Sequence, residues 1–125
     1  MKTQFGFSLN LDTDPKIFLE KVSPALEREA SIHSFFLSLT TRYVQNHKPM
    51  ALLAHLANSN GELIAAGIQT ETDRVLIISN CTEADAITFS DLLSEDGVRL
   101  PGVNGPSPAV DSFAKKWASH KGPSF

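Results

Sequence analysis

The sequence lacks most of the features that mark a specialised protein. Its 125 residues include one cysteine, so no disulfide can form within the chain. No apolar run approaches the roughly 20 residues that a membrane-spanning helix requires. The first 14 residues lack the apolar core of a secretory signal peptide. These absences favour a protein of the reducing cytoplasm.

The charges exclude two classes of partner. Eleven Lys and Arg residues against 14 Asp and Glu residues give a formal net charge of −3, and the basic residues form no cluster. Nucleic-acid-binding proteins usually carry a basic patch, and anionic membranes attract basic segments. We therefore expect neither nucleic acid nor a membrane as a partner. The length and the hydrophobic fraction of 42% are those of one globular domain.

Metal chemistry is not indicated either. The histidines stand at positions 33, 47, 55 and 120, and none pairs with a second histidine, a cysteine or a carboxylate at metal-ligand spacing. His33 lies inside an expected helix, where a structural role is favoured. The acidic residues lie near expected helix ends, where helix starts favour negative charge, or on faces that are expected to be exposed to solvent. We therefore assign no catalytic residue and no metal ligand.

Hydrophobic periodicity predicts the first elements. Alternation over residues 5–11 predicts a half-buried strand, and Asp14-Pro15 is a typical helix start. Ser23-Pro24 repeats this start signal, which indicates either two short helical pieces or one kinked helix. A further helix is predicted to bury one face, made of Ile32, Phe35, Phe36, Leu39 and Tyr43.

Residues 50–79 predict an antiparallel meander of three strands, with a hairpin turn at 58–61. Gly67 within this meander indicates a bulge or a close backbone approach. Thr82 is expected to cap the next helix, which carries Leu92 at the edge of its buried face.

The last third of the chain is predicted to hold a brief strand at 98–100 and a final helix after Ser107-Pro108. The order of elements predicts an α+β domain, in which a largely antiparallel central sheet packs with about four helices.

Cys81 lies between an apolar strand and a helix start, and a helix N-terminus lowers the pKa of a thiol. It is therefore a candidate reactive thiol. The alternative, which we favour, is a small buried apolar residue, because the sequence identifies no partner base. A pairing of Cys81 with one of the histidines stays open at this point.

The most distinctive segment is the turn Leu100-Pro101-Gly102-Val103-Asn104-Gly105-Pro106. Gly102, Asn104 and Gly105 are the candidate substrate-loop residues, because they give the loop its shape. Such a turn before a helix can also present backbone N–H groups to an anion. The spacing matches neither common phosphate-binding motif. The alternative is a rigid turn that fixes the helix carrying Trp117, which is expected to anchor the core.

This turn, the helix behind it and residues 24–39 resemble the N-terminal halves of some bacterial GNAT-family N-acetyltransferases. The shared features are the "PGVNGP" turn and a helical segment in the first half, and the resemblance spans about residues 14–122. It implies that residues 1–125 form a single GNAT-like N-terminal domain with a partial GNAT fold.

One departure from the family bears on activity. GNAT enzymes hold the pyrophosphate of acetyl-CoA on a [RQ]-x-x-G-x-[GA] loop between the fourth strand and the third helix. That position here reads Ser79-Asn80-Cys81-Thr82-Glu83-Ala84-Asp85, which has no glycine and places two acids where a phosphate must approach. The resemblance thus implies a degenerate unit without its own catalysis. The resemblance also implies that this unit supplies a scaffold or part of the acceptor-substrate cleft.

On this interpretation the chain binds no cofactor itself. Acetyl-CoA belongs to the parent family, and the catalytic GNAT domain would lie in a missing C-terminal half. Two alternatives stay open. The chain is a stand-alone binding or dimerisation module without enzymatic activity, whose second copy covers an apolar face, or it is an enzyme that uses Cys81 as its nucleophile.

Overall fold

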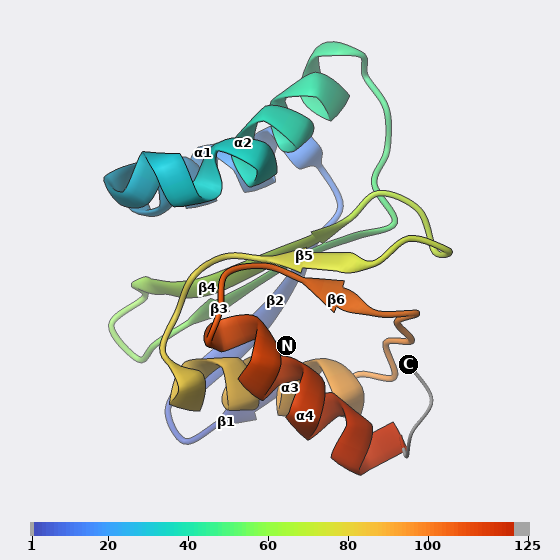
Figure 1. The fold of residues 1–125 in the computed structure, drawn as a ribbon. Helices are drawn as coiled ribbons and strands as arrows, with labels where there is room; N and C mark the ends of the chain where they lie inside the picture. The colour runs from blue at the N-terminus through green and yellow to red at the C-terminus, as the bar shows by residue number, and fades with distance from the viewer. Residues whose placement is uncertain (1, 122–125) are drawn as a thin grey trace.

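The computed structural model describes residues 2–121, which form a mixed sheet between two layers of helices (Figure 1). The sheet has six strands in the order β1-β2-β3-β4-β5-β6, and each neighbouring pair is antiparallel except β5–β6, which is parallel. The strands are β1 (Lys2–Gln4), β2 (Phe7–Asp12), β3 (Leu52–Ala57), β4 (Leu63–Gln69), β5 (Leu76–Ile78) and β6 (Val103–Asn104).

The helices divide between the two faces of the sheet (Figure 1). One layer consists of α1 (Pro15–Leu26) and α2 (Ala30–Gln45), joined by a 3-10 turn at Glu27–Glu29. The opposite layer consists of α3 (Glu83–Glu95) and α4 (Ala109–Lys121). This arrangement is α+β, as the order of elements predicts, and its strands β3, β4 and β5 form the predicted meander.

The alternation of side chains along the strands creates two cores. Leu53 of β3 packs under α1 and α2 together with Phe18 and Phe36, whereas Leu56 packs on the α3–α4 side. The α3–α4 core is aromatic, since the Phe113 ring lies edge-on to Phe89 and is stacked with Trp117, with 5.9 Å between ring centroids in each pair. Trp117 is buried and anchors the core as predicted.

Gly67 allows the α3 layer to approach the sheet. A Cβ atom at this position would lie 3.1 Å from Leu76 Cδ1 and 3.3 Å from Phe89 Cζ, so the residue marks a close approach. The bulge lies elsewhere in the same pair of strands, where the register shifts between Leu56 and Ala57.

Several predicted boundaries are wrong. Phe5 is not part of the first long strand, because it lies exposed in the turn between β1 and β2 with a positive φ of 52°. The two helical pieces suggested by Ser23-Pro24 are one helix, which continues through Pro24. Leu92 is fully buried rather than at the edge of α3.

The short strand predicted at 98–100 is absent, and β6 forms three residues later. Its position depends on a partner that is distant in the sequence, because the Leu76 N–H donates to the Gly102 carbonyl at 3.0 Å and begins the parallel pairing with β5.

The predicted buried face of α2 is also shifted. Its buried residues are His33, Phe36 and Thr40, while Ile32 and Phe35 are 48% and 60% exposed. A hydrophobic pattern assigns no burial to histidine, but His33 can be buried here because both ring nitrogens find partners. The turn of the helix toward His33 leaves two large apolar side chains uncovered.

Among the described residues, no helix is both long enough and apolar enough to cross a membrane.

The aromatic packing generates a stability prediction. Phe89→Ala should lower the free energy of unfolding by about 3–5 kcal/mol, because it removes a fully buried ring and leaves a cavity against Phe113. Ile87→Ala on the same helix should lower it by about 1 kcal/mol or less, since Ile87 is 39% exposed. Urea unfolding followed by circular dichroism measures both, and equal losses would contradict this assignment of the inward face of α3.

Candidate functional site

The turn after β6 takes its shape from contact with β5. Gly105 lies so close to β5 that a Cβ atom there would be 2.7 Å from Ile78 Cγ1 and 2.8 Å from the Ile78 carbonyl oxygen. Asn104 stabilises the same turn, because its Oδ1 accepts a hydrogen bond from the Gly105 N–H at 2.9 Å. Gly102 supplies the carbonyl that starts the β5–β6 pairing. All three predicted turn residues therefore help to fix the shape of the turn or its position against β5.

A small cavity of about 270 Å³ lies between this turn and α2, and we call it the turn pocket. Asn104, Gly105 and Pro106 form one side, and the opposite side is formed by α2. The lining from α2 and β5 is mainly apolar and consists of Ile32, His33, Phe35, Phe36, Ile77 and Ile78. The structure thus brings Asn104 and Gly105 to the wall of a pocket. Gly102 does not line it.

His33 fixes the wall of this pocket. The Asn80 N–H donates to His33 Nε2 at 2.9 Å, so Nε2 carries no hydrogen. Nδ1 then carries the hydrogen and donates to the Leu26 carbonyl at 2.9 Å. The imidazole is 3% exposed. Its role is structural, since it connects α2 to the end of α1 and to the loop between β5 and α3.

Two backbone donors of the loop at 79–85 are used within the protein. The Asn80 N–H is bonded to His33, and the Asp85 N–H donates to the Thr82 hydroxyl at 3.1 Å, as expected for a helix cap. Glu83 and Asp85 place two carboxylates in the first turn of α3, and Glu83 Oε1 accepts from the Ser112 hydroxyl at 3.1 Å. These two amides are therefore not available to a phosphate, and the two carboxylates would repel one.

Cys81 lies in the same loop and is half-buried. Burial, and to a lesser extent the nearby charge of Asp85, raises the pKa of its thiol to about 12. The thiolate is therefore rare at neutral pH, and this environment argues against the candidate reactive thiol. Burial and an adjacent acid outweigh the helix N-terminus that suggested a lowered pKa.

A second, larger cavity adjoins the turn pocket. It has a volume of about 730 Å³ and lies between α2 and the edge formed by β5 and the β4–β5 turn; we call it the α2–β5 groove. Phe35, Ile77 and Asn104 line both cavities. Charged side chains surround the groove, namely Arg42, Lys48, Glu71, Asp73 and Arg74. The sequence analysis missed this groove, because nothing in the local pattern brings residues 42 and 48 opposite residues 71–74.

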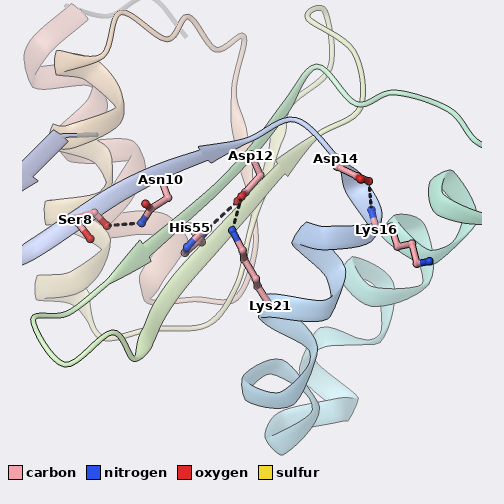
Figure 2. Close-up of polar contacts among 7 residues, drawn as sticks. All are labelled: Ser8, Asn10, Asp12, Asp14, Lys16, Lys21 and His55. Carbon is pink, nitrogen blue, oxygen red and sulfur yellow. Dashed lines mark hydrogen bonds and ion pairs between the residues drawn. The ribbon is translucent and has the colours of Figure 1, made fainter.

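A polar cluster that the sequence did not indicate joins α1 to the sheet (Figure 2). The Asp12 carboxylate accepts from His55 Nδ1 at 2.8 Å and from Lys21 Nζ at 2.9 Å. The three residues are brought together by β2, β3 and α1. None of them lines the two cavities described above. The cluster thus positions α1, and we assign no chemistry to it.

Within the described residues, no group of three or more histidine, cysteine, aspartate or glutamate side chains could hold a metal ion. His120 lies on α4, and its Nε2 is 2.5 Å from Asp91 Oδ1. It is distant in the sequence from the other three histidines and contacts a different residue.

No protein-family model matches the chain, and no curated protein or solved structure matches it.

The contact at Gly105 predicts a position-specific loss of stability. Gly105→Ala should destabilise the fold by about 1–3 kcal/mol through collision with the Ile78 backbone, in addition to the strain of its positive φ. Gly61→Ala is the matched control, because it also has a positive φ but open space around the added Cβ. Thermal unfolding of both variants tests this, and a loss at Gly105 no larger than at Gly61 would contradict the steric argument.

The raised pKa of Cys81 predicts how the thiol reacts. Its alkylation by iodoacetamide in the folded protein should still accelerate about tenfold per pH unit between pH 8 and 10, because only the thiolate reacts. In urea the rate should level off near the ordinary thiol pKa of about 9. A plateau at the same pH in both states would show that the fold does not protect the thiol.

The same shift has a defined effect on stability. The folded pKa lies above the unfolded value, so the stabilising contribution of the neutral thiol is complete below about pH 9 and is lost as the pH rises toward 12. Comparison with Cys81→Ala over this range isolates the contribution, since the other titrating groups are common to both proteins. The difference in stability between the two should change in the alkaline range and stay constant from pH 6 to 8.

Proposed function

We propose that this chain is the N-terminal, non-catalytic unit of a GNAT-family acetyltransferase and supplies a scaffold and one wall of the acceptor-substrate cleft. Two observations support the relationship. The turn at 100–106 carries the sequence resemblance, and the order of elements places a meander, the Thr82 helix, a short strand and a last helix in the succession that the resemblance implies.

The observation that carries the non-catalytic assignment is the state of the loop between β5 and α3. A pyrophosphate needs free amides at a helix start. Here the Asn80 N–H is bonded to His33, the Asp85 N–H is bonded to Thr82, and the carboxylates of Glu83 and Asp85 repel an anion. On this proposal the unit has lost its own acetyl-CoA site, and acetyl-CoA binds to the catalytic unit of the parent enzyme.

The turn pocket supports the assignment of an acceptor wall. It combines an apolar lining from α2 and β5 with the side chain of Asn104. Asn104 Oδ1 is used within the turn, so its amide nitrogen is the group that can donate to a substrate. The catalytic unit supplies the opposite wall, and the whole protein belongs to the cytoplasm.

Isothermal titration with acetyl-CoA, with free CoA as a control, tests the loss of the cofactor site. No heat of binding is expected at high protein concentration. Binding at micromolar strength would overturn the non-catalytic assignment, because another group of donors would then replace the missing loop.

A gain-of-function variant tests the family relationship itself. Thr82→Gly, Glu83→Gln and Asp85→Asn together restore a glycine to the loop and remove both carboxylates, and the variant should acquire measurable CoA binding that depends on the pyrophosphate. Glu95→Gln, which removes a carboxylate at the opposite end of α3, is the matched control and should not bind. A folded triple variant that binds no CoA would count against this placement of the loop.

A further inference from the structure

Large apolar side chains are exposed on both walls of the α2–β5 groove. Phe35 on the α2 wall is 60% exposed, and Val75 on the opposite wall is 41% exposed. Ile32, one turn before Phe35, is 48% exposed and lines the adjoining turn pocket. Large apolar side chains that gather around one concavity and are rimmed by charge are typical of an interaction surface.

The two walls of the groove carry opposite charge. The α2 wall holds Arg42 and Lys48, and the opposite wall holds Glu71 and Asp73, with Arg74 beside them. Within the described part of the chain, none of these five side chains forms an ion pair or a side-chain hydrogen bond. The α2 wall therefore has two unpaired positive charges, and the opposite wall has a net charge of −1.

We infer that the α2–β5 groove is an interface for a second copy of this chain, related to the first by a two-fold axis. In such a pair, the same patch meets itself in reverse. The basic wall of each copy then faces the acidic wall of the other, while Phe35 and Val75 of both copies become buried between them. A partner whose surface carries charges of only one sign would neutralise one wall of the groove and leave the other wall unpaired. A second copy carries charges of both signs and neutralises both walls.

The free edge of the sheet lies beside the same surface. In the described residues, β6 pairs only with β5, so its outer edge has no strand partner. An uncovered edge of this kind invites association, and a second copy would cover it. Because Phe35, Ile77 and Asn104 line both cavities, the second copy would also close the turn pocket from the groove side. This inference does not depend on acetyl-transfer chemistry.

Two charge-reversal variants test the inference through their specificity. Arg42→Glu with Lys48→Glu makes both walls acidic, and Glu71→Lys with Asp73→Lys makes both walls basic. Like charges across an interface are strongly unfavourable, so each variant alone should dimerise at least about tenfold more weakly than the unaltered chain. Sedimentation velocity over a range of protein concentrations measures the dissociation constants.

An equimolar mixture of the two variants is the decisive sample. The reversed wall of each variant then faces a wall of opposite charge on the other, so the mixture should recover dimerisation while either variant alone does not. Lys115→Glu on α4, which reverses one exposed charge outside the groove, serves as a control and should dimerise normally. Circular dichroism verifies that each variant folds, which is expected because all substituted side chains are exposed and unpaired.

Three results would overturn the inference. An unaltered chain that stays monomeric at the highest concentration would show that a second copy does not cover the groove. Dimers that persist in both variants would place the interface elsewhere. Failure of the mixture to recover would show that the opposed walls do not meet across a two-fold axis.

Discussion

The two hydrogen bonds of His33 determine how α2 lies on the sheet. The ring donates to the Leu26 carbonyl at the end of α1 and accepts from the Asn80 N–H after β5, so it joins three parts of the chain. An unpaired buried imidazole is unfavourable, and a fully paired one fixes the rotation of its helix. Once His33 faces inward, Ile32 and Phe35 must face outward.

The hydrogen bonds of His33 affect both the loop between β5 and α3 and the α2–β5 groove. By bonding the Asn80 amide, His33 removes a donor from the loop between β5 and α3. By turning α2, it opens the apolar surface of the α2–β5 groove. The occupied Asn80 amide and the exposed apolar side chains of α2 thus have one physical origin, which lies in a residue whose sequence context suggests only a structural role.

The elements that the sequence predicts well are those encoded by local chemistry. Asp14 and Thr82 cap their helices through backbone donors two or three residues away. Trp117 is buried because the apolar stripe around it is regular. The features that the sequence misses depend on partners far along the chain. The face of α2 that is buried depends on the hydrogen bond that the Asn80 N–H donates to His33. The position of β6 depends on the hydrogen bond that the Leu76 N–H donates to the Gly102 carbonyl.

The candidate site also combines features that are visible in the sequence with features that depend on distant parts of the chain. A turn rich in glycine and proline is visible in the sequence, and so is the absence of a glycine from residues 79–85. The sequence favours a buried apolar role for Cys81 over a reactive thiol, but the extent of its burial is decided by the packing of the whole loop. The opposed charges of the groove were equally invisible, since they lie on elements about 30 residues apart in the sequence.

The close approach of Gly105 to Ile78 has a consequence for the interpretation of sequence motifs. The backbone of β5 leaves no room for a side chain at this position, so selection against larger residues acts there even when the protein binds nothing. A short, distinctive turn of this kind can therefore be required by strand packing alone, and a role in binding must be established from other residues.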